Sequence, residues 1–263
     1  MRTATTMLAL LLMAAPAARA QEFGPIPFEM LRLGAAAPGK AVAGKPLLGT
    51  PNVSGYKVKG IDVSTYQGDI VWAKVAKAGA DFAYIKATEG GDMVDDRFSA
   101  NWNGARAAGL PRGAYHFYNF CRGGAVQAAN FIRTVPEDSA ALPPMIDLED
   151  AGGCGVSQRD FLRQFAVFIA RLQAAYHRPP ILYTTYLVYG KYLSGIAGHY
   201  KLWIADTRHS TPILPARQRW AFWQYSFAGH LSGISGAVDL DVFNGTPRDF
   251  GLFVGGTALA TNP

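Results

Sequence analysis

The sequence predicts a single α/β domain built as a modified TIM-like barrel that has few or no helices around its last third. Eight short segments rich in β-branched and aromatic residues follow one another, and eight strands close a small parallel barrel. Helical patterns fit between the early segments, whereas the last three segments leave little room for helices. The 263 residues, 49% hydrophobic and 17% charged, are enough to bury such a core.

Each predicted strand is an apolar or alternating run bounded by turn-forming residues. The eight runs are residues 56–64, 81–88, 112–119, 143–149, 179–185, 200–206, 219–226 and 237–243.

Three helices are predicted from their periodicity and their end signals. The first two cover residues 71–78 and 96–108, and each is followed by a glycine in the stop position. The third opens at Ser157, with Asp160 three residues later as in a capping box, and carries an apolar stripe from Phe161 to Tyr176. We expect this stripe to pack against the sheet.

The ends of the chain are expected to lie outside the barrel, which we assign to residues 56–246. Residues 1–20 combine Arg2, an apolar run and a small-residue ending, as in a secretory signal cleaved after Ala20. The run is shorter than the roughly 20 residues of a membrane-spanning helix. Residues 21–55, rich in Pro, Gly and Ala, predict a leader or linker, and residues 247–263 predict a surface tail.

Charge and cysteine content narrow the class of protein. Removing residues 1–20 deletes two arginines and leaves 23 basic against 19 acidic residues, a net charge of +4. The basic residues are scattered, which gives little support to nucleic-acid binding. Cys121 and Cys154 are an even number in a chain that we expect to be exported, so they form either a bridge or two free thiols.

Acidic residues gather at predicted strand ends. Asp62 ends the first strand, Asp147 and Glu149 end the fourth, and Asp239 and Asp241 lie in the last. In such barrels the carboxyl ends of the strands form the active face. Asp147 and Glu149 are two residues apart and share a face, so their repulsion should raise one pKa, as a general acid requires.

Two other interpretations of the acids stay open. They could be solvated turn residues, or they could bind Ca²⁺ or Mg²⁺. The sequence has no spaced His pair and no EF-hand loop, so we predict neither a metal nor another cofactor.

Aromatic residues crowd the same strand ends and would suit a cleft for a neutral, flat-faced polymer such as a glycan, although each could equally be core. They are Tyr66, Tyr118, Tyr183, Trp203, Trp223 and Tyr225. Nucleophilic alternatives are weak because Ser64 lies outside a G-x-S-x-G elbow, and His116 is expected to be a hydrogen-bonded barrel residue.

Seven motifs in order resemble the glycoside hydrolase family 25 lysozymes, the Chalaropsis-type N-acetylmuramidases. They are DVSTYQG from Asp62, YIKATEG from Tyr84, GAYHFY from Gly113, MIDLE from Met145, LWIAD from Leu202, FWQYS from Phe222 and VDLDVF from Val238. The resemblance covers residues 60–244. It implies a (β/α)5(β)3 barrel that cleaves the β-1,4 bond between N-acetylmuramic acid and N-acetylglucosamine in peptidoglycan.

The resemblance also implies roles for individual residues. Glu149 would be the general acid, Asp147 would orient the substrate acetamido group, and Asp62 and Asp239 match two further active-site acids. Asp241 stands where the family often has Asn, and we assign it no catalytic role.

Substrate-binding residues and a disulfide follow from the same comparison of motifs. The residues expected to bind substrate are Tyr66, Tyr118, Tyr183, Trp203 and Gln224. Cys121 and Cys154 follow neighbouring strands of such a barrel, so we predict a bridge between them.

Three questions stay open from the sequence. The nucleophile could be the acetamido oxygen, Asp147 or water. The scaffold could instead be a non-catalytic glycan-binding protein, or a metal-dependent hydrolase with another substrate. We expect a secreted or periplasmic monomer without stable membrane association.

Overall fold

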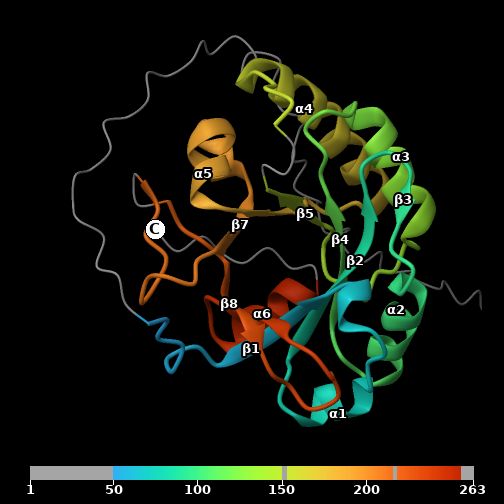
Figure 1. Ribbon diagram of the computed structural model, residues 1–263, viewed down its shortest axis with the longest axis vertical. Helices are drawn as coiled ribbons and strands as arrows, with labels where there is room; N and C mark the ends of the chain where they lie inside the picture. Colours follow the sequence, from blue (N-terminus) through green and yellow to red (C-terminus); the bar gives the residue numbers. More distant parts are fainter. Residues whose placement is uncertain (1–49, 150–152, 216–217, 256–263) are drawn as a thin grey trace, which may run out of the picture.

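The computed structural model describes residues 50–149, 153–215 and 218–255, and these form a closed barrel surrounded on one side by helices (Figure 1). The strand order is β1-β9-β8-β7-β6-β5-β4-β2, and β1 also pairs with β2, which closes the ring; β3 is a short hairpin partner of β2. The strands are β1 Val58–Val63, β2 Phe82–Glu89, β3 Met93–Val94, β4 Arg112–Phe117, β5 Met145–Leu148, β6 Ile181–Thr184, β7 Lys201–Ala205, β8 Phe222–Gly229 and β9 Val238–Phe243.

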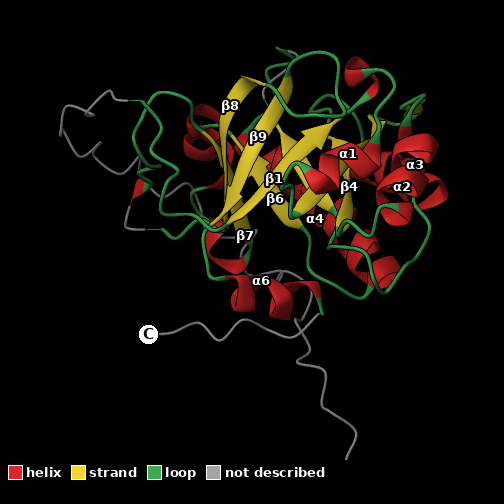
Figure 2. Cartoon of the chain, turned by 90° about the horizontal axis from the view of Figure 1, so that it is seen from below, coloured by secondary structure: helices red, strands yellow, loops and turns green. Residues whose placement is uncertain are grey.

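Helices follow five of the barrel strands, and among the described residues no α-helix separates the last three, so the predicted (β/α)5(β)3 arrangement is confirmed. The helices are α1 Trp72–Lys77 after β1, α2 Phe98–Ala107 after β2, α3 Gly124–Thr134 after β4, α4 Gln158–Tyr176 after β5 and α5 Tyr186–Val188 after β6. Figure 2, viewed from below, shows α1 to α3 gathered on one flank of the strands.

One strand runs against the expectation of a parallel barrel. Strands β1, β2 and β4 to β8 pair in parallel, but β9 is antiparallel to both of its neighbours, β8 and β1. The connection from β8 to β9 spans only residues 230–237 and contains no helix, so the chain turns back directly, as in a hairpin. The first residues of β9 therefore lie at the rim where the parallel strands end.

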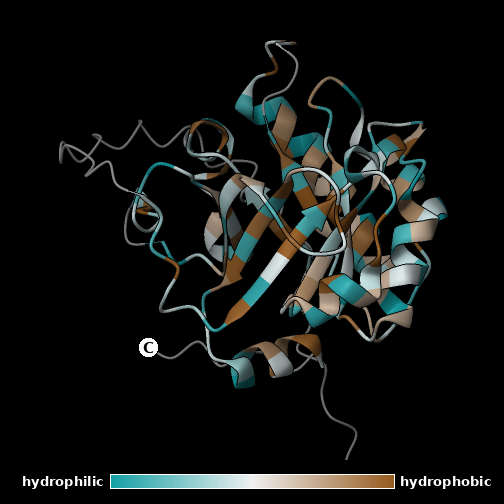
Figure 3. Cartoon of the chain, turned by 60° about the horizontal axis from the view of Figure 1, so that its bottom comes forward, coloured by the Kyte–Doolittle hydropathy of each residue, from teal (hydrophilic) through white to brown (hydrophobic). Residues whose placement is uncertain are grey.

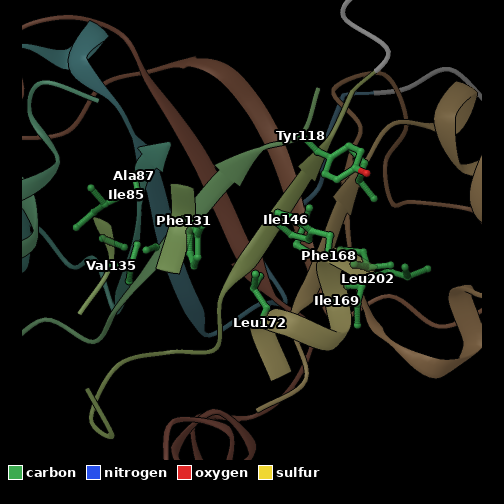
Figure 4. Packing of buried hydrophobic residues seen from close by; sticks show 14 of the residues in the cluster. Ile85, Ala87, Tyr118, Phe131, Val135, Ile146, Phe168, Ile169, Leu172 and Leu202 are labelled. Carbon is green, nitrogen blue, oxygen red and sulfur yellow. The ribbon is translucent and has the colours of Figure 1, made fainter. Parts of the chain in front are cut away.

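Two apolar layers hold the fold together, one between the barrel and the helices and one inside the barrel. Figure 3 shows hydrophobic residues along the barrel strands, and Figure 4 shows side chains of the outer layer. In the outer layer, α4 packs the predicted stripe of Phe161, Phe165 and Phe168 against the sheet, and all three side chains are buried. Ser157 caps α4 by accepting a hydrogen bond from the Asp160 N–H at 3.1 Å, as predicted.

The barrel interior is filled mainly by aromatic rings. Trp203 stacks on Phe222 with ring centroids 5.0 Å apart, and Tyr84 meets Trp203 edge to face at 5.1 Å. Glycines make room for these rings, because a Cβ at Gly60 would lie 2.3 Å from the ring of Phe82. The interior is thus a packed core rather than a pore.

The predicted surface tail is wrong for residues 247–254, which form helix α6, Pro247–Val254. Thr246 and Asp249 make a capping box, and Pro247 occupies the first turn. Phe250 and Phe253 are buried against the interior rings. The helix therefore closes the end of the barrel opposite the acidic rim.

Two other boundaries differ from the predictions. Helix α3 was not delimited from sequence, because its Gly-Gly start lacks a side-chain cap. The predicted leader, residues 21–55, is described only from residue 50, and its Asn52 N–H donates to the carbonyl oxygen of Ser210 at 3.1 Å. The end of this segment is therefore docked on the domain, while the predicted signal, residues 1–20, lies outside the described residues.

Candidate active site

Four carboxyl groups from distant parts of the chain meet at one rim of the barrel. Asp62 lies near the end of β1, Asp147 lies near the end of β5, and Glu149 directly follows that strand. Asp239 lies opposite Asp62 in the antiparallel register of β9 and β1. The reversal of β9 thus places an acid from the start of a strand beside acids from strand ends.

Burial makes these acids weak. Asp62 and Asp147 are 7% and 9% exposed, and burial raises the pKa of each well above its usual range. Negative neighbours add to this effect: Asp239 for Asp62, and Glu149 for Asp147. Burial, followed by the charge of Glu149, raises the pKa of Asp239 to about 6. The carboxyl groups at the rim therefore hold their protons more strongly than isolated carboxyl groups do.

A chain of hydrogen bonds fixes Asp62. The Gln224 Nε2 donates to Asp62 Oδ2 at 2.7 Å, and the Tyr183 hydroxyl donates to Gln224 Oε1 at 2.5 Å. Gln224 and Tyr183 are 2% and 4% exposed. Both residues are predicted substrate contacts, and these two hydrogen bonds connect them to Asp62.

One carboxyl oxygen of Asp147 accepts no hydrogen bond from the described residues. Its Oδ1 atom is buried and has no hydrogen-bond partner among the described residues. A buried acceptor without a donor is costly, so this atom is suited to receive an N–H or O–H from a bound molecule.

Lys86 is a site residue that the sequence reasoning missed. It is 8% exposed on β2, its Nζ lies 2.8 Å from Glu89 Oε2, and it stands 4.9 Å from the centre of the Phe117 ring. Its positive charge lowers the pKa of Asp147 and so opposes the effect of burial. The sequence signal that could have identified Lys86 is its position as a lysine within the apolar run FAYIKAT.

The predicted aromatic contacts divide into exposed and buried groups. Tyr66 is 88% exposed on the short helix Thr65–Gln67 after β1, beside the acids. Trp203 is fully buried deep in the barrel interior, so the assignment of Trp203 to direct substrate contact is not supported. Tyr118 is also buried, and it packs outside the barrel against Phe161, Phe165 and Phe168 of α4. Figure 4 shows Tyr118 and Phe168 in this layer.

The other two aromatic candidates lie on β8. Trp223 is fully buried and donates its indole N–H to the carbonyl oxygen of Asp206, whereas Tyr225 is half-buried.

His116 is structural, as expected. It is fully buried, with Nδ1 2.7 Å from Thr88 Oγ1 and Nε2 3.2 Å from Gln127 Oε1. Burial lowers its pKa to about 4, so the ring is neutral near pH 7. It belongs to the layer between sheet and helices and not to the acidic rim.

The predicted disulfide between Cys121 and Cys154 is confirmed, with the two Cα atoms 5.7 Å apart. The bridge joins the loops that follow β4 and β5. In the sequence, Cys154 comes five residues after Glu149.

Among the described residues, no group of three His, Cys, Asp or Glu side chains is arranged to hold a metal ion. No helix in the described part of the chain is long and apolar enough to cross a membrane.

Comparison with known proteins places this geometry in context. The sequence profile of Glycosyl hydrolases family 25 matches residues 61–234, which include all the acids except Asp239 and Asp241. Escherichia coli K12 YegX is 36% identical over 206 residues, covering 76% of this chain and 75% of YegX. Lysozyme M1 of Streptomyces globisporus is 39% identical over 211 residues, covering 76% and 71%.

A solved structure agrees with the sequence relatives. The family 25 glycosyl hydrolase from Bacillus anthracis superposes with a TM-score of 0.73 at 37% identity, covering 79% of this chain and 98% of that one.

Proposed function

This chain belongs to glycosyl hydrolases family 25 and is a glycoside hydrolase, and we propose that it is an exported muramidase that cleaves peptidoglycan. The bond cut would be the β-1,4 linkage from N-acetylmuramic acid to N-acetylglucosamine. The observation that carries the proposal is the meeting of Asp62, Asp147, Glu149 and Asp239 at one rim. The name of the Streptomyces relative, Lysozyme M1, supports the substrate class.

Glu149 is the proposed general acid. It is partly exposed directly after β5, so its carboxyl group is accessible to a glycosidic oxygen over the rim. Proton donation to that oxygen lets the leaving sugar depart with its bonding electrons, while positive charge develops on the ring that stays bound.

Asp147 is proposed to hold the substrate acetamido group. Its unpartnered Oδ1 would accept the acetamido N–H, and this hydrogen bond favours the ionised form of Asp147. Lys86 favours the same form through its charge. The proton released from the buried acid is then available to Glu149, the neighbour whose charge had helped to raise the pKa of Asp147.

The acetamido oxygen is proposed as the nucleophile, which would attack the anomeric carbon and form a cyclic intermediate that water then opens. Asp62 and Asp239 would stabilise the positive charge of this intermediate, and Gln224 would keep Asp62 in place. Two inversions at the anomeric carbon give net retention, so nuclear magnetic resonance of the fresh product should detect the β-anomer. An initial α-anomer would instead indicate direct attack by water.

The deciding experiment is mass spectrometry of purified peptidoglycan incubated with the protein. We expect soluble fragments ending in reducing N-acetylmuramic acid from the wild type and none from Glu149→Gln. Glu137→Gln, which changes an exposed carboxyl outside the rim, is the matched control and should leave the products unchanged. No fragments from the wild type on several walls would reject the muramidase assignment.

We also propose that the protein acts outside the cytoplasm as a monomer. The disulfide supports export, because such bonds persist in oxidising compartments. Cleavage after Ala20 would leave Gln21 as the first residue, which N-terminal sequencing of exported protein checks.

A further inference from the structure

Asp241 is a buried carboxyl group on β9 that the proposed mechanism does not use. Its side chain is fully buried, and neither carboxyl oxygen has a hydrogen-bond partner among the described residues. An ionised carboxylate in such a place would lack most of the donors that it requires, although the Trp203 indole favours the ionised form. The side chain therefore needs another explanation.

The register of the sheet places Asp241 beside Asp62. Asp241 lies opposite Gly60 on β1, and Asp239 lies opposite Asp62, so the side chains of Asp241 and Asp62 share a face as diagonal neighbours. Gly60 has no side chain to separate them. Two ionised carboxyl groups are both acceptors, so they form a hydrogen bond with each other only when one of them carries a proton.

We propose that Asp241 is a neutral acid whose O–H donates a hydrogen bond to Asp62, so that the pair holds one proton and Asp241 positions Asp62 at the rim. The donor that Asp241 supplies complements the one from Gln224, which reaches the Oδ2 atom of Asp62. Asp241 is thus a positioning residue, and this part of the inference rests on the proposed function.

The electrostatic surroundings agree with a proton on this pair. Burial, followed by the charge of Asp62, raises the pKa of Asp241 well above its usual range, and the Trp203 indole only partly offsets this. The other titratable groups acting on the pair come from five elements around it: Asp239 on β9, Asp147 on β5, Glu149 after β5, Tyr183 on β6, Tyr225 on β8 and Tyr115 on β4. All of these groups are acidic, so ionisation of both members would add to existing repulsion.

The variant Asp241→Asn distinguishes the titration of Asp241 from its hydrogen bond to Asp62. The amide has nearly the same shape and still donates to Asp62, but it does not ionise. Because the pKa of Asp241 is raised in the folded state, its stabilising contribution is complete below the pKa of the unfolded chain and is lost as pH rises toward the folded pKa. The variant lacks this loss.

The first test is the melting temperature of wild type and Asp241→Asn at several pH values between about 4 and 8. The melting temperature of the variant relative to wild type should rise by about 3 to 5 °C per pH unit above the ordinary carboxyl range. Infrared spectra at neutral pH should show a protonated carboxylic acid band in wild type that is weaker in the variant. A constant difference in melting temperature and unchanged infrared spectra would overturn the proposal.

The positioning role is tested by kinetics on peptidoglycan. Asp241→Ala removes the donor and should lower kcat by on the order of tenfold with little change in KM, whereas Asp241→Asn should retain most of the wild-type kcat. Equal losses in both variants would overturn the positioning role. If the wild type cleaves no peptidoglycan, the proposed function fails, while the melting and infrared measurements still decide where the proton is.

Discussion

Removing the disulfide should cost stability by an amount that the position of the bridge predicts. Cys121 and Cys154 are 33 residues apart, and the loop that they close contains α3 and β5. For a loop of this length the chain-entropy relation gives roughly 3.7 kcal/mol at 25 °C. At about 2 to 4 °C per kcal/mol for a chain of this size, the melting temperature should fall by roughly 7 to 15 °C.

The assay is urea denaturation of the wild type and of the variant carrying both Cys121→Ser and Cys154→Ser, each with and without reductant. The reduced wild type should match the double variant, and reductant should leave the double variant unchanged. A loss below about 1 kcal/mol would refute the reasoning, because it would mean that the two loops hold each other equally well without the bond.

Four further outcomes are expected. Asp239→Asn should gain stability relative to wild type as pH rises from about 4 through 6. The pKa of Asp239 is raised to about 6, so wild type loses the stabilising contribution of the protonated Asp239 over this range, and urea denaturation midpoints measure the difference. Phe253→Ala should lose about 3 to 5 kcal/mol in denaturant unfolding, whereas Leu252→Ala, on the exposed face of α6, should change stability by less than about 1 kcal/mol. Lys86→Met should move the acid limb of kcat/KM to higher pH, because the lost positive charge lets the pKa of Asp147 rise further; an unmoved limb contradicts the role of Lys86. A chelator should leave activity unchanged, since the proposed chemistry uses carboxyl groups, the substrate and water, and no metal ion.

Local patterns predicted the strands and the gathering of the acids because strand periodicity and β-propensity act over a few residues. The alternation of side chains along a strand also predicts which face of the sheet Tyr118 occupies. In β4 Tyr115 faces the interior and His116 faces the helices, so Tyr118, two residues after His116, shares its outward face. The prediction of Tyr118 as a substrate contact gave more weight to residue type than to this alternation.

Other features depend on contacts that the local sequence does not contain. The direction of β9 is fixed by pairing with β1 and β8, and the depth of Trp203 depends on the stagger of the barrel. Helix α6 has eight residues and gains its stability by burying Phe250 and Phe253 in a barrel built from the rest of the chain. Its capping box, Thr246 to Asp249, was the one local signal that could have identified it.

Helix α6 and the stacked rings above it also bear on how the acidic cluster exchanges protons with solvent. The aromatic rings of the interior and Phe253 of α6 lie between the acidic cluster and the bottom of the barrel, so we expect its protons to exchange with solvent mainly across the rim. A glycan lying over that rim would cover the same route. During each turnover the cluster would then hold a fixed number of protons and could redistribute them only among its own carboxyl groups and the sugar.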